Sequence, residues 1–115
     1  MRIYLSHPYG GGLDNWVRIN ELLTELAIGD PDNTYISPVH CFGGLYNAVP
    51  YSRGMEMCLD LLSVCDRMVV YGDWQDSVGC RAEVEYCEQQ GIPVEYRRVG
   101  GRCGGQSDGK ATGVD

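Results

Sequence analysis

Residues 2–12 read R-I-Y-L-S-H-P-Y-G-G-G, and this stretch decides the fold. Residues 2–6 have little polar interruption, which predicts a strand buried on both faces of a sheet. Residues 7–12 cannot easily continue a strand or a helix, so they are expected to form a loop. Residues 13–28 predict a helix, because apolar side chains recur there at helical spacing: Trp16, Ile19, Leu22, Leu23, Leu26 and Ala27.

The rest of the chain repeats this alternation of strand and helix. Further strands are expected at residues 33–37, 67–71 and 92–96, and further helices at 55–65 and 78–90. Alternating strands and helices predict an α/β domain with a short parallel sheet of four strands, or five, joined by right-handed crossovers.

Two segments depart from this pattern. Residues 39–52 contain Gly43, Gly44 and Pro50 and have no clear period, so we expect a long loop that is functional or mobile. Residues 100–115 are rich in glycine and offer almost nothing to bury, which predicts a flexible tail. The 115-residue chain therefore has room for one domain, over residues 1–99.

The charge and the apolar content of the chain limit the classes of partner that it can bind. The formal net charge of -7 argues against a nucleic-acid polymer or an anionic membrane, because both would repel the chain, although a small anionic ligand is still compatible with it. No apolar run approaches the roughly 20 residues of a membrane span, and the N-terminal apolar stretch is too short for a signal peptide. We therefore expect a cytoplasmic protein.

The cysteines fit that compartment. The six cysteines form no C-x-x-C pair and no cysteine/histidine cluster of the zinc type, so neither a disulfide framework nor a metal site is expected. Four of them fall within helical patterns, where a free cysteine behaves as a small apolar residue. Reduced thiols are the expectation.

The carboxyl ends of parallel strands are where open α/β sheets bind their ligands. The loop after Ser6 contains Gly10 and Gly11, which would let backbone amides approach a phosphate or a ribose, but a plain tight turn explains them equally well. His7 could be a general acid or an ordinary loop histidine. In residues 39–52, Tyr46 and Tyr51 could stack on a base or only cover the edge of the core.

The segment after the third predicted strand carries the clearest chemical pattern. Ser77 is suited to cap the helix that follows it. Gly79 and Glu83 are four residues apart and share one helix face near that end, where the glycine would leave room for a ligand beside the carboxylate. A single glutamate on a helix is usually a surface charge, as expected here for Glu85 and Glu88.

Three motifs together resemble a known superfamily. They are I-Y-L-S-H-P-Y-G-G with Asn15 soon after, L-x-x-x-C-D before the third strand, and G-D-W-x-x-S-x-G-x-x-x-E from residue 72 to residue 83. The chain resembles the nucleoside 2-deoxyribosyltransferase-like superfamily, and most closely a short branch found in phages and bacteria. The resemblance covers roughly residues 1–94.

The resemblance implies a three-layer flavodoxin-like or Rossmann-like fold and cleavage or transfer at the N-glycosidic bond of a nucleoside or nucleotide. By position, Glu83 is the expected nucleophile and Tyr4 the residue that orients it. The expected substrate-binding residues are Ser6, His7, Gly10, Gly11, Asp73, Trp74, Ser77 and Gly79, with Ser77 placed to hold a 5′-phosphate. The resemblance implies no metal or other cofactor, a homo-oligomer (a dimer or larger), and a bacterial or phage-encoded protein of the cytoplasm.

One departure from the family pattern keeps a second interpretation open. Many relatives have an aspartate where this chain has Cys58, so its role is lost or passes to Asp60, Asp73 or Asp76. The leaving base needs a proton, for which His7, Asp73 and Asp76 are all candidates. The alternative function is a binding module of the same fold, which holds a nucleotide or nucleotide signal without cleaving it.

Overall fold

The computed structural model describes residues 1–98, so the tail expected at residues 100–115 lies outside the described part. Strands and helices alternate along the chain as the sequence predicts. The elements in chain order are β1 (Arg2–Ser6), α1 (Leu13–Gly29), β2 (Thr34–Ile36), α2 (Pro38–Phe42), the 3₁₀ helix η1 (Gly43–Leu45), α3 (Tyr51–Leu62), β3 (Arg67–Tyr71), the 3₁₀ helix η2 (Trp74–Asp76), α4 (Val78–Gln90) and β4 (Val94–Arg97).

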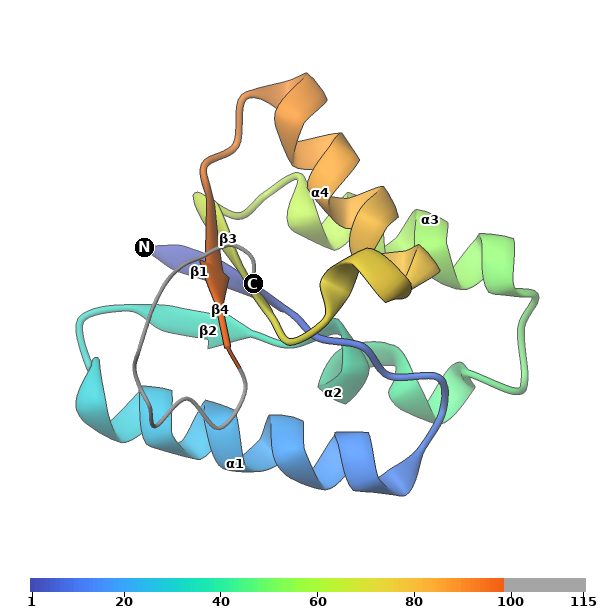
Figure 1. The fold of residues 1–115 in the computed structure, drawn as a ribbon, viewed down its shortest axis with the longest axis horizontal. Helices are drawn as coiled ribbons and strands as arrows, with labels where there is room; N and C mark the ends of the chain where they lie inside the picture. Colours follow the sequence, from blue (N-terminus) through green and yellow to red (C-terminus); the bar gives the residue numbers. More distant parts are fainter. Residues whose placement is uncertain (99–115) are drawn as a thin grey trace.

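Within residues 1–98 the sheet has four strands, all parallel, in the order β2-β1-β3-β4. The chain first moves outward from β1 to β2 and then returns to the other side of β1 with β3. The strand order therefore reverses between β1 and β3, and their carboxyl ends flank the crevice where sheets of this kind bind ligands. Helix α1 lies on one side of the sheet, and α3 and α4 lie on the other (Figure 1). This is the three-layer flavodoxin-like arrangement.

Alternation along the central strands divides the core into two halves. Ile3 and Leu5 of β1 pack with Ile19 of α1 on one face of the sheet. Tyr4 faces the opposite way and packs with Leu62 of α3 and with residues of α4. Because both faces of β1 and β3 are covered, these strands read as nearly continuous apolar runs in the sequence.

Residues 39–52 are not the irregular loop that the sequence predicted. Most of them belong to α2, η1 and the start of α3, and only residues 46–50 form a turn between η1 and α3. Helix α3 begins at Tyr51, four residues before the expected start. The Ser37 hydroxyl accepts a hydrogen bond from the His40 amide at 3.2 Å, and Pro38 occupies the first turn of α2, so a capped helix starts here. Helices this short contain too few turns for their apolar spacing to stand out.

The other predicted elements are close to their expected positions. The predicted helices at residues 13–28 and 78–90 are confirmed as α1 and α4. Ser77 caps α4 by accepting from the Cys80 amide at 3.3 Å, and Gly91 ends it in the left-handed conformation with φ 74°. The loop expected after β3 contains η2, and β4 starts two residues later than predicted.

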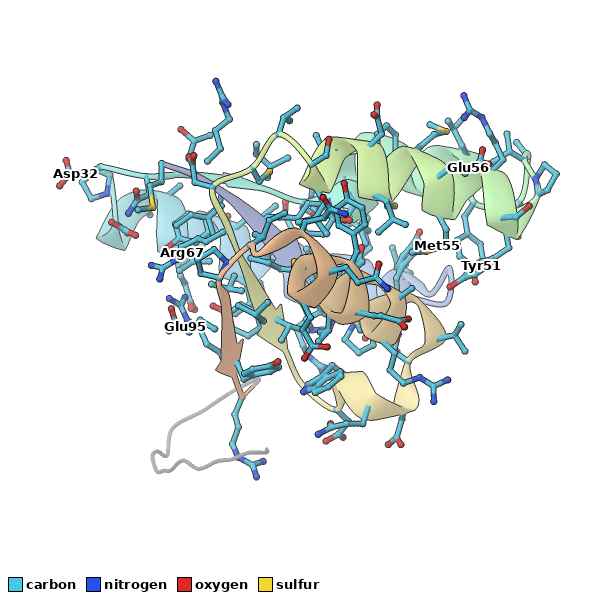
Figure 2. The ribbon with its side chains drawn as sticks, turned by 90° about the horizontal axis from the view of Figure 1, so that it is seen from above. Asp32, Tyr51, Met55, Glu56, Arg67 and Glu95 are labelled. Carbon is cyan, nitrogen blue, oxygen red and sulfur yellow. The ribbon has the colours of Figure 1, made fainter. Side chains whose placement is uncertain are left out.

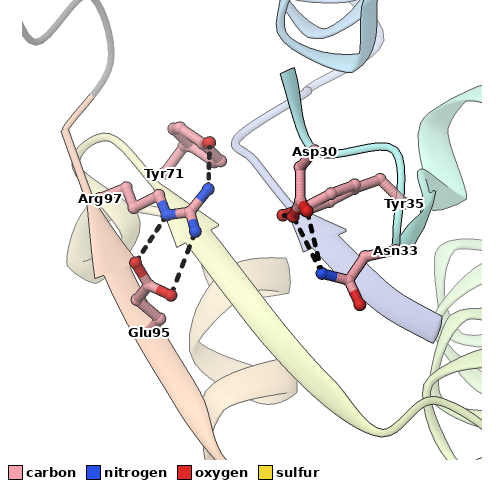
Figure 3. Close-up of polar contacts among 6 residues, drawn as sticks. All are labelled: Asp30, Asn33, Tyr35, Tyr71, Glu95 and Arg97. Carbon is pink, nitrogen blue, oxygen red and sulfur yellow. Dashed lines mark hydrogen bonds and ion pairs between the residues drawn. The ribbon is translucent and has the colours of Figure 1, made fainter. Parts of the chain in front are cut away.

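Polar contacts tie the end of β4 to the sheet on the α1 side (Figure 3). Arg97 pairs with Glu95 at 2.8 Å and donates to the Tyr71 hydroxyl at 3.0 Å. Farther along this side, the Asp30 carboxylate accepts from Asn33 and from the Tyr35 hydroxyl. No helix within residues 1–98 is long and apolar enough to cross a membrane.

Replacing Leu62 by alanine tests the core on the α3 and α4 side. Leu62 is fully buried, so Leu62→Ala should lower the free energy of unfolding by about 2–5 kcal/mol. Val64 lies two residues away with 55% of its surface exposed, and Val64→Ala should stay within about 0.5 kcal/mol of the wild type. Urea unfolding of both variants measures the difference, and equal effects would contradict this core packing.

Candidate functional site

A cavity of about 610 Å³ opens at the carboxyl edge of the sheet. The loop after β1 forms one wall, α2 and η1 form the next, and the first turns of α3 and α4 complete it. Most of the lining side chains are aromatic or aliphatic, and the charged group among them is Glu83. A largely apolar cavity with a few convergent polar groups is typical of small-molecule sites.

The Glu83 carboxylate is bound by two hydroxyl groups from the central strand. Tyr4 and Ser6 are two residues apart on β1, so their side chains point to the same face of the sheet, toward α4. The Tyr4 hydroxyl donates to Oε2 of Glu83, and the Ser6 hydroxyl donates to Oε1 at 2.6 Å. These two bonds fix the orientation of the carboxylate.

Glu83 is 6% exposed, although it carries a carboxyl group. Burial raises the pKa of Glu83 above 4.5, and the hydrogen bonds from Ser6 and Tyr4 act in the opposite direction. Burial and the neighbouring Glu83 also raise the pKa of Tyr4 well above its usual value, so the Tyr4 hydroxyl keeps its proton and donates it. Burial of the Glu83 carboxylate therefore lowers the stability of the fold, and the hydroxyl donors Tyr4 and Ser6 offset part of that effect by favouring the charged form.

Two cysteines line the cavity near Glu83. Burial, followed by the effect of Glu83, raises the pKa of Cys58 and of Cys80 to about 11. Both thiols therefore stay protonated at neutral pH and behave as apolar wall residues rather than as nucleophiles.

The loop after β1 and the segment around η1 interlock through two tyrosine–glycine contacts. Gly11 has a φ of +80°, and a Cβ atom there would come within 2.9 Å of the Tyr46 ring. On the other segment, a Cβ atom at Gly43 would lie 3.4 Å from the Tyr9 hydroxyl. The rings of Tyr9 and Tyr46 meet edge to face, 5.3 Å between centroids. This contact joins two walls of the cavity.

A third tyrosine lies against the first turn of α4. A Cβ atom at Gly79 would lie 3.1 Å from the Tyr51 hydroxyl and 3.7 Å from Sδ of Met55. Figure 2 shows Tyr51 and Met55 on the side of α3 that faces α4. Gly79 lines the cavity as expected, but Tyr51 takes part of the room that the glycine leaves.

His7 lines the cavity, and a backbone carbonyl holds one of its ring nitrogens. Nδ1 lies 2.7 Å from the Pro8 carbonyl oxygen, which can only accept, so Nδ1 carries the hydrogen and Nε2 has a free lone pair. Nε2 is buried without a hydrogen-bond partner among residues 1–98. Burial lowers the pKa of His7. The role of His7 as a proton donor remains a prediction.

A comparison with protein families shows what the chain is similar to. The model of a family described as a domain of unknown function, DUF4406, matches residues 1–96. The chain belongs to the DUF4406 family. No curated protein matches the chain.

Several of the expected site residues of this DUF4406 protein do line the cavity: His7, Gly10, Ser77, Gly79 and Glu83. Tyr4 and Ser6 lie behind Glu83, where they touch its carboxylate rather than the open space. Gly11 lies beneath the Tyr46 ring. A substrate-binding role for each of these residues remains a prediction.

Asp73 and Trp74 lie elsewhere. Trp74 belongs to η2, with Asp73 just before it, and neither is among the residues that line the cavity. The Trp74 ring packs on Tyr96 of β4, with 5.4 Å between centroids. Their part in binding therefore also remains a prediction.

The sequence analysis did not include Tyr9, Phe42 or Met55 among the site residues. All three line the cavity of the DUF4406 chain. Tyr9 directly precedes the glycines of the first loop in the sequence, and this position could have identified it as a site residue. Within residues 1–98 there is no group of three or more histidine, cysteine, aspartate or glutamate side chains that could hold a metal ion.

Replacing Glu83 with glutamine should stabilise the protein at alkaline pH. Because the folded state raises the pKa of Glu83, it holds the proton more tightly than the unfolded chain, and this stabilising effect is lost as the pH rises through the folded pKa. Glu83→Gln should therefore melt at a higher temperature than the wild type at pH 8, because the amide carries no charge to bury.

The matched control is Glu85→Gln, which changes an exposed carboxylate on the same helix. The difference in melting temperature between Glu83→Gln and wild type should shrink toward pH 4, whereas Glu85→Gln should show no such trend. A Glu83→Gln variant that is less stable than the wild type at pH 8 would contradict the cost assigned to the buried charge.

Proposed function

We propose that this protein cleaves or transfers the N-glycosidic bond of a nucleoside or nucleotide, with Glu83 as the nucleophile that attacks C1′. The observation that carries the proposal is the buried Glu83 carboxylate, held by Tyr4 and Ser6 at the wall of an apolar cavity. The resemblance of the sequence motifs to the nucleoside 2-deoxyribosyltransferase-like superfamily supports the same assignment. In that proposal the protein is an N-glycosyl hydrolase or a (deoxy)ribosyltransferase.

The reaction would proceed in two displacements. In the first, an oxygen of Glu83 forms a bond to C1′ as the base leaves, through an oxocarbenium-like transition state. In the second, water or another base attacks C1′ and releases Glu83. Water as the acceptor gives hydrolysis, and a base gives transfer.

Tyr4 and Ser6 would act as positioning residues in this reaction. A carboxylate that accepts one hydrogen bond on each oxygen still has a free lone pair on each, so it can be held in place and attack at the same time. The two donors also oppose the effect of burial on the pKa of Glu83 and so favour the ionised form that a nucleophile needs.

The aromatic wall is suited to the base of the substrate. Tyr9, Tyr46 and Tyr51 line the cavity, and their rings can stack on a planar heteroaromatic group. Ser77 stands at the N-terminus of α4, where the resemblance assigns a hydroxyl to the 5′-phosphate. The Ser77 oxygen caps the helix and still has its own proton to donate.

One observation favours the second candidate, a module that binds a nucleotide without cleaving it. Cys58 lines the cavity where many relatives of the resembling superfamily carry an aspartate. Burial raises the pKa of Cys58 to about 11, so it neither carries a negative charge nor readily gives up a proton at neutral pH. A site that lacks this acid could retain affinity and lose turnover.

The two candidates differ in whether free base appears. The protein would be incubated with a panel of ribo- and deoxyribonucleosides and their 5′-monophosphates, and released base would be separated by chromatography. We expect at least one compound to lose its base, at a rate that Glu83→Gln lowers by a factor of about 10³ or more, because Gln cannot form the covalent bond.

Glu85→Gln is again the control and should match the wild-type rate, since its exposed side chain lies away from the cavity. If calorimetry shows that an intact nucleotide binds while no base is released by any variant, the binding module is correct. Equal release by wild type and Glu83→Gln would place the nucleophile elsewhere.

A further inference from the structure

The cavity joins one negative charge to several aromatic rings. Its lining within residues 1–98 includes Glu83 and the rings of Tyr9, Phe42, Tyr46 and Tyr51, and it includes no lysine or arginine. The chain as a whole has a formal net charge of -7. Ring faces and a carboxylate both attract cations, and the surrounding negative potential does the same over a longer range.

Within residues 1–98 the lining holds no carboxyl group besides Glu83 that could protonate a leaving base. An efficient general acid has a pKa near the working pH. The pKa of Cys58 and of Cys80 is raised to about 11, and Nδ1 of His7 is directed at the Pro8 carbonyl oxygen rather than left free for a ligand. Asp73 and Asp76, which the sequence offered as alternatives, are not among the lining residues.

We propose that the substrate of this site is an N-glycoside whose leaving base carries a fixed positive charge, such as a pyridinium riboside or an N7-alkylated purine nucleoside. This inference rests on the proposed function, because it takes Glu83 as the nucleophile. It names the class of base that the cavity holds. Both examples share one chemistry, a ring nitrogen made cationic by its bond to carbon.

The bonds and charges balance without a general acid. An oxygen lone pair of Glu83 forms the bond to C1′, and the electron pair of the C1′–N bond passes to the ring nitrogen or its conjugated system. This pair cancels the positive charge, so the base leaves as a neutral molecule and takes no proton. Water then attacks C1′, the bond to Glu83 breaks, and one proton is released to solvent.

An uncharged nucleoside would lack two advantages of the cation, which are departure of the base without a proton and attraction to the ring faces. Its base leaves as an anion unless a proton is supplied, and the two thiols of the lining, Cys58 and Cys80, have pKa values of about 11 that are too high for this role. Its ring would still stack on tyrosine, but without the added attraction between a cation and the ring faces. The site would therefore favour a cationic base over an uncharged base of nearly the same shape.

Two matched pairs of compounds test this discrimination. Nicotinamide riboside is compared with its neutral 1,4-dihydro form, and 7-methylguanosine is compared with guanosine. Released base is followed by chromatography at pH 6, where 7-methylguanosine keeps its N1 proton and its positive charge, and the rate with Glu83→Gln is subtracted as the background. We expect kcat/KM to be at least tenfold higher for the cationic member of at least one pair, and the pair that shows it identifies a pyridine or a purine site.

The outcomes separate this inference from the proposed function. If the neutral members lose their bases as fast as the cationic ones, and Glu83→Gln abolishes this, the nucleophile stands and the preference for charge is wrong. If none of these four compounds nor any nucleoside of the wider panel loses its base, the proposed function fails and the inference fails with it.

A binding measurement gives an independent readout. The cation 1-methylnicotinamide has no sugar to cleave, and nicotinamide is its neutral counterpart. Quenching of intrinsic fluorescence should show at least fivefold tighter binding of the cation. Tyr46→Leu should remove most of that preference, whereas Tyr46→Phe, which keeps the ring, should retain it. Equal affinity for the two compounds in the wild type would overturn the proposed role of the aromatic lining.

Discussion

The hydrogen bonds from Tyr4 and Ser6 to the Glu83 carboxylate are the interaction on which the site depends. They connect the central strand to α4 across the core, over a separation of nearly eighty residues in the chain. For these bonds to form, β1 must present alternate residues to the α4 side, and α4 must start directly after the Ser77 cap so that Glu83 faces the sheet. The register of β1 beside β3 and the start of α4 thus determine the position of the Glu83 carboxylate as well as the packing of the core.

The same interaction holds a carboxylate that lowers the stability of the fold but is needed for the proposed chemistry. An almost fully buried carboxylate costs free energy unless hydrogen bonds compensate it, and burial remains the larger of the two effects on the pKa of Glu83. Sites that retain such a group in spite of its cost are often functional. Around Glu83 the protein places apolar and aromatic side chains, which exclude water and strengthen the field of the charge.

The fold was predictable from local patterns because each element agrees with its surroundings. The apolar run of β1, the helical spacing of α1 and the cap and glycine at the two ends of α4 all act within a few residues, and the sequence displays them directly. Glu83 was also accessible to such reasoning, since Ser77, Gly79 and Glu83 lie on one short segment.

The rest of the site depends on contacts between segments that no local pattern records. The wall formed by α2 and η1 was expected to be a loop, because Gly43, Gly44 and Pro50 read as breakers and the helices are too short to show a period. The fit of Tyr46 on Gly11 and of Tyr9 beside Gly43 appears only when the two segments meet. Asp73 and Trp74 show the converse, because both belong to the motif of residues 72–83 and yet neither lines the cavity.

The most direct test of the account is to trap the covalent intermediate on Glu83. A 2′-fluoro-substituted analogue of a nucleoside substrate, which slows the second displacement, would be incubated with the protein and followed by mass spectrometry of the intact chain and its tryptic peptides. The account predicts one added glycosyl group, located by fragmentation at Glu83 in the peptide that follows Arg81, and absent from Glu83→Gln. An adduct on another residue, or base release from the analogue that persists unchanged in Glu83→Gln, would contradict it.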